Sequence, residues 1–258
     1  MPRFNANLSM MFTEVPFLDR FAAAAAAGFR GVEFLFPYDF PKEVLSEALK
    51  GSGLELVLHN MPPGDWGKGE RGLACIPGRE AEFRAGVARG LEYARHLGLR
   101  QIHCMAGIAP ANVPTGVLRR TYVDNLRFAA AEAARAGVRL LIEPINDRDI
   151  PGYFLNYSSQ AIDIMDEVGS DNVALQYDIY HMQIMEGDLA PTMERLLGRI
   201  GHMQLADTPG RHEPGTGEIN YPFLFDHLDR IGYPGWIGCE YRPAGRTEDG
   251  LGWLKGRL

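Results

Sequence analysis

The sequence predicts a single-domain (β/α)8 barrel, and three observations support this. The chain has 258 residues, close to the roughly 250 that one such barrel needs. Short apolar runs rich in Val, Ile, Leu and Phe alternate with longer segments of helical periodicity, and several of these segments end at a glycine. No linker, low-complexity tract or charge block marks a domain boundary. One domain built from repeated strand-helix units therefore accounts for the whole chain.

The individual elements follow from this alternation. The predicted strands are residues 4–8, 31–36, 55–59, 101–105, 139–143, 173–178, 201–206 and 236–240. Helical candidates are residues 17–27, 79–97, 122–136, 159–168, 188–197 and 221–231. No GxGxxG motif follows the first strand, so a closed barrel is favoured over an open doubly wound sheet.

One predicted connection is unusually long. Residues 60–78 separate the third strand from the next helix, whereas strand-to-helix links usually have about 2–6 residues. Loops of this length are commonly lids or binding loops, and a self-packed surface loop is the alternative.

Composition and charge limit the class of protein. Apolar residues make up 46% and charged residues 23%, as in ordinary globular proteins, and the net charge is −7. This charge argues against nucleic-acid and membrane partners. The three cysteines form no CxxC motif, the first residues do not resemble a secretory leader, and no apolar stretch approaches membrane-spanning length. We therefore expect a cytoplasmic protein, with a homo-oligomer left open.

Polar residues end or lie within each of the last four predicted strands, at the barrel end where active sites are found. They are Glu143, Asp178, Gln204 and Glu240. Taken singly, each is more often a helix cap or a satisfied core group. Together, three carboxylates in one barrel mouth would repel each other unless a cation lay between them. Glu33, on the second strand, is a weaker candidate that would orient a neighbour inside the barrel.

The predicted ligands also select the metal. Three carboxylates and an amide carbonyl are hard oxygen donors, which suit Mg²⁺ or Mn²⁺ and do not favour zinc. An octahedral ion would keep two positions for adjacent carbonyl and hydroxyl oxygens of a substrate. The carbon-bound proton would then lie between Glu143 and Glu240, which predicts proton transfer through an enediolate.

In these features the sequence resembles the hydroxypyruvate isomerase family, within the xylose-isomerase-like TIM barrel superfamily. The resemblance is carried by motifs such as Gly-Phe-Arg-Gly-Val-Glu-Phe (28–34), His-Asn-Met-Pro-Pro-Gly-Asp-Trp (59–66), Ile-Glu-Pro-Ile-Asn (142–146), Gln-Tyr-Asp-Ile-Tyr-His-Met-Gln (176–183) and Gly-Cys-Glu-Tyr (238–241). It implies interconversion of hydroxypyruvate and tartronate semialdehyde. It also implies that Glu143 and Glu240 are the acid/base pair, and that both hold the metal with Asp178 and Gln204. Related ketose epimerases usually have His at the position of Gln204.

Charge balance suggests the substrate-binding residues. A divalent metal with three carboxylates is already negative, so a small anionic hydroxy-carbonyl acid needs cationic or hydrogen-bonding partners nearby. His181, three residues after Asp178, and Arg211, in the loop after the seventh strand, are the strongest candidates. His59, at the end of the third strand, and Lys68 and Arg71, in the long loop, are further candidates.

Three other functions were weighed. A 2-oxo-tetronate isomerase would share the metal, the glutamates and the overall pattern. A metal-dependent phosphodiesterase like the DNA-repair endonucleases of this superfamily would need further His and Asp ligands and a basic face, whereas this chain has seven His and a negative net charge. A non-catalytic sugar-acid binding module would not need two opposed glutamates at a metal.

Overall fold

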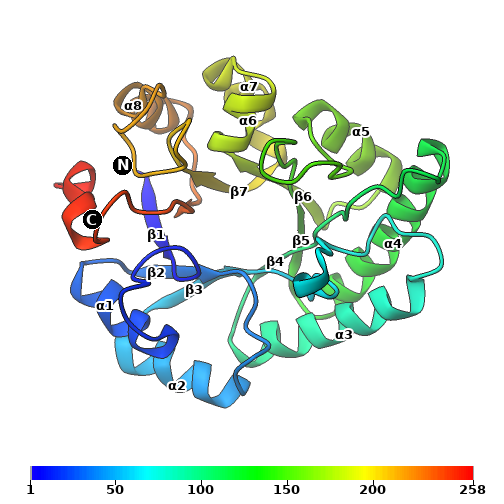
Figure 1. Ribbon diagram of the computed structural model, residues 1–258, viewed down its shortest axis with the longest axis horizontal. Coiled ribbons are helices and arrows are strands. Elements are labelled where there is room, and N and C mark those ends of the chain that lie inside the picture. The colour runs from blue at the N-terminus through cyan, green and yellow to red at the C-terminus, as the bar shows by residue number, and fades with distance from the viewer. Residues whose placement is uncertain (1, 258) are drawn as a thin grey trace.

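The computed structural model describes residues 2–257, which form a barrel of eight parallel strands surrounded by helices (Figure 1). The strands are β1 (Arg3–Asn7), β2 (Gly31–Phe34), β3 (Glu55–His59), β4 (Gln101–His103), β5 (Arg139–Ile142), β6 (Val173–Asp178), β7 (Ile200–Leu205) and β8 (Trp236–Cys239). Their order in the sheet is β3-β2-β1-β8-β7-β6-β5-β4. The seam between β3 and β4 is bridged by a parallel pairing of Asn60 with His103.

The helices lie outside the strands and connect each one to the next. They are α1 (Arg20–Ala26), α2 (Lys42–Ser52), α3 (Glu80–His96), α4 (Thr115–Arg135), α5 (Ser158–Val168), α6 (Ile179–Met185), α7 (Leu189–Leu196) and α8 (Tyr221–Ile231). Four short 3-10 helices are η1 (Phe17–Asp19), η2 (Trp66–Lys68), η3 (Leu197–Arg199) and η4 (Glu248–Leu254). Among the described residues, no helix combines the length and apolar character that crossing a bilayer requires.

The predicted barrel is confirmed, with differences at the ends of elements. All eight predicted strands are present, but the fourth ends at His103, and Glu143 and Glu240 each lie one residue beyond a strand. Two helices, α2 and α6, were not among the predicted candidates. Helix α6 begins directly after β6, because the side chain of Asp178 caps it by accepting a hydrogen bond from the backbone N–H of Tyr180 at 2.8 Å.

The inside of the barrel is apolar at its base. Leu58, Leu141 and Ala174 form a small buried cluster there. Gly201 packs against it so closely that an added Cβ would lie 2.7 Å from Leu141 Cδ2 and 2.9 Å from the Cβ of Ala174, so a larger residue would require these neighbours to shift. In barrels of this architecture, ligands bind at the end where the strands terminate.

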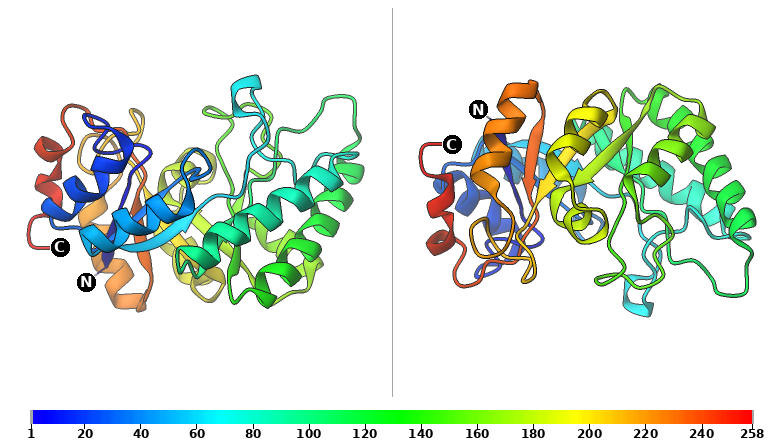
Figure 2. Two further views of the ribbon diagram at one scale, coloured as in Figure 1. Left: turned by 90° about the horizontal axis from the view of Figure 1, so that it is seen from below. Right: turned by 90° about the horizontal axis from the view of Figure 1, so that it is seen from above.

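The long loop is fixed to the barrel at several points. The backbone N–H of Cys75 donates to the carbonyl of Ala106 at 2.8 Å, and the side chain of Asn125 donates to the carbonyl of Ala74 at 2.9 Å. Nearer the tip, Glu70 pairs with Arg79 at 2.7 Å. The tip itself carries η2 and projects from the body of the molecule (Figure 2). The loop is therefore partly self-packed and partly placed beside the barrel mouth.

Candidate active site

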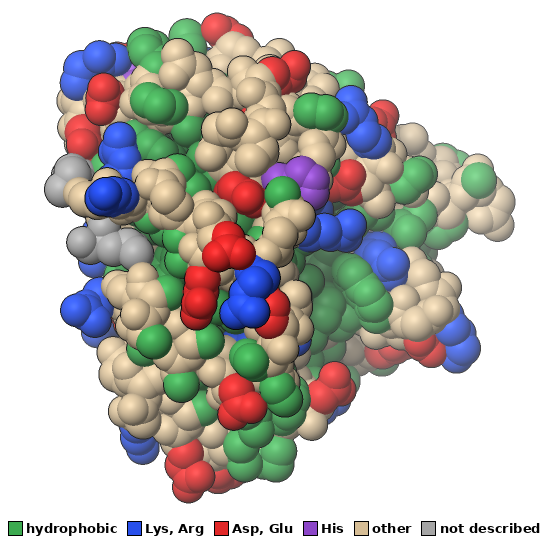
Figure 3. All heavy atoms as spheres, turned by 60° about the vertical axis from the view of Figure 1, so that its left-hand side comes forward, with side chains coloured by type: hydrophobic (Ala, Val, Ile, Leu, Met, Phe, Trp, Pro, Cys, Tyr) green, Lys and Arg blue, Asp and Glu red, His purple; other side chains and the backbone are tan. Residues whose placement is uncertain are grey.

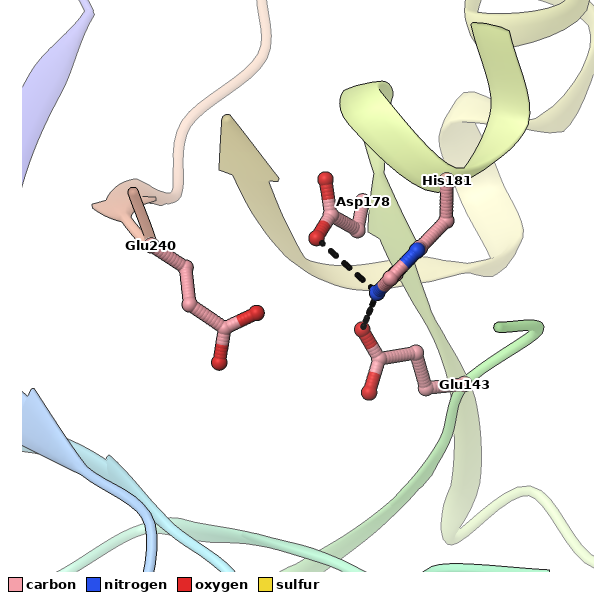
Figure 4. A group of neighbouring side chains, drawn as sticks. All are labelled: Glu143, Asp178, His181 and Glu240. Atoms are coloured by element: carbon pink, nitrogen blue, oxygen red, sulfur yellow. Dashed lines mark ion pairs between the residues drawn. The ribbon is translucent and has the colours of Figure 1, made fainter. Parts of the chain in front are cut away.

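Four buried side chains converge where the strands end. Glu143 follows β5, Asp178 ends β6, His181 lies in the first turn of α6, and Glu240 follows β8. One ligand atom from each lies within 4.8 Å of the others, and all four residues are at most 5% exposed. Figure 4 shows Glu240 approaching this point from one side and the other three from the opposite side. They line or adjoin a cavity of about 500 Å³.

The carboxylates of this cluster require positive charge nearby. Burial raises the pKa of Asp178 to about 6 and that of Glu240 to about 8. The pKa of Glu143 is raised well above its usual range by burial and then by the charges of Glu240 and Asp178. In addition, Glu143 Oε1 and Asp178 Oδ2 have no hydrogen-bond partner among the described residues. Buried, unpartnered carboxylate oxygens of this kind fit a divalent cation with oxygen ligands.

The carboxylate of Glu240 is oriented by two neighbours. Arg211 Nη2 donates to Glu240 Oε2 at 2.8 Å, while Arg211 Nη1 donates to Asp149 Oδ2 at 2.9 Å. The guanidinium also lies over the ring of Tyr180, with its carbon 5.0 Å from the ring centroid. From the other side, Asn7 Nδ2 approaches Glu240 Oε1 at 3.3 Å. The structure therefore places Arg211, a predicted substrate-binding residue, directly beside a predicted catalytic glutamate.

The hydrogen bonds of His181 determine its tautomer. The side-chain oxygen of Asn146 accepts from the backbone N–H of Asp149 at 2.7 Å, so the amide nitrogen of Asn146 is the atom that faces His181 Nδ1 at 2.6 Å. Nδ1 is thus an acceptor, and in the neutral ring the hydrogen lies on Nε2. Burial lowers the pKa of His181 well below its usual value, which favours this neutral form.

This tautomer bears on whether His181 binds metal. Its Nε2 lies 3.5 Å from Asp178 Oδ2 and 3.9 Å from Glu143 Oε1 (Figure 4). A metal-binding histidine donates from its other ring nitrogen, whereas here that nitrogen accepts. Although His181 lies in the cluster, its contacts therefore favour the predicted role of hydrogen-bond donor over that of ligand.

A polar network lies in the barrel directly below the cluster, with Glu33 at its centre. The carboxylate of Glu33 accepts hydrogen bonds from Asn5, Asn7 and Gln204 at 2.8, 3.0 and 2.8 Å, and His202 Nε2 lies 2.8 Å away. Burial would raise the pKa of Glu33, but His202 and the amide donors outweigh it, and the pKa is lowered. Glu33 is thus a buried, ionised group that orients its neighbours, as the sequence suggested.

Gln204 lies at the level of the cluster but has partners of its own. It pairs in register with Asp178 across β6 and β7. Its Nε2 is held by Glu33, which fixes the amide orientation, and its Oε1 accepts from Gln176 Nε2 at 2.6 Å. One lone pair of Oε1 remains, so the metal-ligand role of Gln204 stays a prediction.

Two other predicted residues lie away from the cavity. His59 is buried on the opposite side of β3, where Nδ1 contacts the carbonyl of Asn60 at 3.0 Å and the ring stacks on Phe34 at 6.4 Å. The cavity lining includes Asn60 in its place, which argues against the predicted substrate contact of His59. The alternation of side chains along a strand accounts for this, because neighbouring residues point to opposite faces. Lys68 is 82% exposed and pairs with Asp65 at 2.8 Å.

Arg71 does reach the cavity. Its guanidinium stacks on the ring of Trp66 with the carbon 3.7 Å from the centroid, and Nη1 donates to the carbonyl of Glu70 at 2.7 Å. Trp66, Arg71 and Arg242 are all in the lining. In Figure 3 a hollow opens on the right-hand part of the face, with hydrophobic side chains inside it and Lys or Arg side chains at its border. The outer wall of the cavity thus carries cations.

Sequence reasoning missed several residues of this site. His103, the last residue of β4, lines the cavity, and it was missed because the predicted fourth strand continued to residue 105, which placed His103 in its middle. Asn146 lies in the motif Ile-Glu-Pro-Ile-Asn (142–146), but its role depends on the position of His181, which the sequence alone does not give. Asp149 and Tyr180 hold Arg211 in place. Neither could be identified from the sequence, because Asp149 lies in a loop and Tyr180 in a short helix without clear periodicity.

A sequence model described as xylose isomerase-like TIM barrel matches residues 21–257. The chain belongs to this family.

Two members of the xylose isomerase-like family illustrate the similarity in sequence. The chain is 57% identical to the 2-oxo-tetronate isomerase of Cupriavidus necator, over 99% of this chain and 98% of that protein. It is 54% identical to the hydroxypyruvate isomerase of Escherichia coli, over 98% of both chains. A solved structure named AP endonuclease, family 2, from Brucella melitensis is 51% identical, has a TM-score of 0.97, and covers 99% of both chains.

Proposed function

We propose that this protein is an isomerase that interconverts hydroxypyruvate and 2-hydroxy-3-oxopropanoate (tartronate semialdehyde) by proton transfer through an enediolate. The observation that carries the proposal is the opposition of Glu143 and Glu240 across one cavity, with Asp178 between them. Two carboxylates with raised pKa values suit the removal and return of a carbon-bound proton. The similarity to a 2-oxo-tetronate isomerase and a hydroxypyruvate isomerase supports the same class of reaction.

The residues present fit a divalent metal, with Mg²⁺ favoured and Mn²⁺ as the alternative. Glu143, Asp178, Gln204 and Glu240 would hold it, since the first two carry unpartnered buried oxygens and all four offer oxygen donors. When bound, the metal would act as a Lewis acid that stabilises negative charge on the substrate oxygens.

The protein's own groups would carry out the proton transfers. One of Glu143 and Glu240 removes the proton from the hydroxyl-bearing carbon, and the other delivers a proton to the former carbonyl carbon. Arg211 and Asn7 hold Glu240 in a fixed orientation, which keeps its carboxylate directed at the cavity. His181, with its hydrogen on Nε2, would donate to a substrate oxygen near Asp178.

The substrate carboxylate would bind among cations of the cavity wall. Arg211 and Arg71 line the cavity from two different loops. Arg242 lies beside Arg211, because the backbone N–H of Arg242 donates to the carbonyl of Arg211 at 2.8 Å. Arg71 is the best placed to meet a carboxylate, because Arg211 already pairs with Glu240 and Asp149.

A substrate panel tests the proposal. Purified protein with Mg²⁺ would be assayed with hydroxypyruvate, tartronate semialdehyde and four-carbon oxo-acids, and kcat/KM compared. We expect the three-carbon pair to be interconverted with the highest kcat/KM. Failure to turn over any of these acids in the presence of Mg²⁺ or Mn²⁺ would refute the proposal.

A 2-oxo-tetronate isomerase is the second candidate. It is favoured by the 57% identity to a protein of that name, and by a cavity of about 500 Å³, which holds a four-carbon acid without difficulty. The same panel separates the two candidates, because a four-carbon isomerase would show a kcat/KM for its substrate well above that for hydroxypyruvate.

A phosphodiesterase is disfavoured although one similar structure is named AP endonuclease. The net charge of −7 would oppose a nucleic acid, and Figure 3 shows acidic and basic side chains interspersed on the face it presents. The group of described residues that could hold a metal contains one histidine, and the hydrogen bonds of this histidine favour a donor role. We infer instead a small-molecule enzyme of the cytoplasm, consistent with three free, buried cysteines.

A further inference from the structure

Isomerisation of a hydroxy-carbonyl acid moves two hydrogens, and the two glutamates account for only one of them. In the proposed function, Glu143 and Glu240 exchange the carbon-bound hydrogen. The hydroxyl hydrogen must also leave its oxygen and reach the former carbonyl oxygen. The overall change needs no oxidant or reductant, but it needs a group that both accepts and donates a proton at oxygen.

His103 occupies a suitable position next to the acid/base pair. It ends β4 at the seam of the barrel, where its carbonyl accepts from the backbone N–H of Met61 at 2.8 Å. Its side chain lines the cavity, and its Nδ1 lies 3.6 Å from Glu143 Oε2. The other oxygen of Glu143, Oε1, faces His181. His103 therefore adjoins the side of Glu143 that is turned away from the metal cluster.

The imidazole of His103 makes no hydrogen bond to any residue that the structure describes. Its side chain is 1% exposed, yet neither Nδ1 nor Nε2 has a hydrogen bond among the described residues. A buried polar atom without a hydrogen-bond partner destabilises the folded state, and it is rare enough in folded proteins to require an explanation such as a ligand or a catalytic role. An apolar side chain of similar size would avoid this cost. We therefore expect the partner to arrive with the substrate.

Two other side chains beside the cavity that could exchange a proton with a substrate oxygen, His181 and Tyr180, are already engaged. His181 has its Nδ1 held by Asn146, so it can present only an N–H. The hydroxyl of Tyr180 donates to Asp149 at 3.2 Å, and both Nη atoms of Arg211 are paired. Among these groups, His103 alone has one donor and one acceptor nitrogen that are both uncommitted.

We propose that His103 is a third catalytic residue, which transfers the oxygen-bound proton between the two reacting oxygens of the substrate. This rests on the proposed function. A ring nitrogen takes the proton as the hydroxyl O–H bond breaks and the new carbonyl forms. It then gives the proton to the former carbonyl oxygen, where the new O–H bond forms, and the ring begins and ends neutral. A neutral histidine acts on the substrate oxygens in triosephosphate isomerase in a comparable way.

The test follows two processes in D₂O by NMR. Wild type, H103Q, H103N and H181Q are incubated with hydroxypyruvate and Mg²⁺, and both product formation and deuterium entry into the remaining substrate are measured. H96Q, a substitution of an exposed histidine on α3, is the matched control. Thermal unfolding with and without Mg²⁺ shows which variants are folded and bind metal, and H103N provides a second variant if H103Q is unstable.

For H103Q we expect kcat to fall by about 10²- to 10⁴-fold with little change in KM, the range for a lost acid-base group. Deuterium should still enter the substrate, because the glutamates still remove the carbon-bound proton. The ratio of substrate deuteration to product should therefore rise about tenfold or more, since an enediolate that cannot move its oxygen-bound proton returns to substrate. H96Q should behave as wild type.

Three results would overturn the assignment. A folded H103Q with near wild-type kcat would remove His103 from the reaction. An equal loss of deuteration and product would show that His103 only supports Glu143. Separation of the two processes in H181Q and not in H103Q would assign the transfer to His181. Absence of turnover by the wild type with any three- or four-carbon acid would instead refute the proposed function, and this proposal with it.

Discussion

Asp207 organises the loop that follows β7, and its replacement should affect both stability and activity. Its buried carboxylate accepts hydrogen bonds from four backbone N–H groups of the loop that follows β7. Oδ1 accepts from Thr208 at 3.0 Å and Ile219 at 3.1 Å, while Oδ2 accepts from Gly215 at 2.9 Å and Gly217 at 3.0 Å. The loop closed in this way carries Arg211, so Asp207 indirectly determines where the guanidinium meets Glu240.

The expected cost of Asp207→Asn follows from these contacts. An amide keeps one accepting oxygen, so two backbone N–H groups would lose their partner and face an NH₂ group. Hydrogen bonds to a charged acceptor contribute about 1.5–3 kcal/mol each, which gives a loss of roughly 3–6 kcal/mol. For a chain of this size we expect the melting temperature to fall by roughly 6–20 °C.

Calorimetry and steady-state kinetics test this reasoning together. Asp207→Asn should lower the melting temperature and also lower kcat/KM for the isomerised acid, because Arg211 loses its fixed position. Asp226→Asn, at an exposed position of α8, is the matched control and should change neither quantity. A melting temperature within about 1 °C of wild type would refute the argument that the carboxylate organises the loop.

Further predictions concern the metal, the glutamates and the long loop. Chelator should abolish activity and Mg²⁺ or Mn²⁺ restore it, and Asp178→Asn should weaken the metal titration; activity in metal-free protein would refute the metal site. The free energy of unfolding of metal-free protein should fall as the pH rises from about 4 to about 8. The folded-state pKa values of Asp178, about 6, and Glu240, about 8, exceed their unfolded values of about 4, so their protonated forms favour the folded state. This stabilisation is lost as the pH rises and each carboxyl group ionises. Denaturation midpoints against pH, with and without Mg²⁺, measure this. Glu143→Gln and Glu240→Gln should each lower kcat by about 10²-fold or more, and a folded, metal-loaded variant with wild-type kcat would contradict the two-glutamate mechanism. Arg71→Ala should raise KM by the equivalent of about 1.5–3 kcal/mol if its guanidinium meets the substrate carboxylate, and an unchanged KM would assign it to loop structure.

The fold was predictable because the pattern of apolar runs is a property of each strand by itself. Every strand lies within one or two residues of its predicted ends. The missed helix α6 shows where this fails. Its seven residues, Ile-Tyr-His-Met-Gln-Ile-Met, are mostly apolar and follow β6 without a break, so periodicity cannot distinguish them from a longer strand. The chain turns from strand to helix at Asp178, whose side chain caps α6 through a local hydrogen bond to the backbone N–H of Tyr180.

The site was predictable only in part, for a related reason. Glu143, Asp178 and Glu240 were found because the ends of barrel strands meet at one place, and the structure brings them together. The prediction for His59 used its position at the end of a strand and did not take into account which face of the strand its side chain occupies. Asn60, the next residue, lines the cavity instead. Residues on connecting loops, such as Asp149, acquire their roles from contacts between segments far apart in sequence, which no local pattern records.

The interior network suggests how the barrel adjusts the two glutamates. Glu33 remains ionised at the centre of the barrel, because His202 and several amide donors outweigh the cost of its burial. Burial is the main cause of the raised pKa values of Glu143 and Glu240, and the negative charge of Glu33 adds a smaller contribution in the same direction. A carboxylate that removes a proton from carbon is more effective when its pKa is raised toward the working pH. The space for Glu33 is made by Gly238 on β8, where an added Cβ would lie 2.3 Å from a Glu33 oxygen. A glycine on a strand thus makes room for a buried charge, and that charge adds to the effect of burial in raising the pKa values of the two glutamates at the barrel mouth.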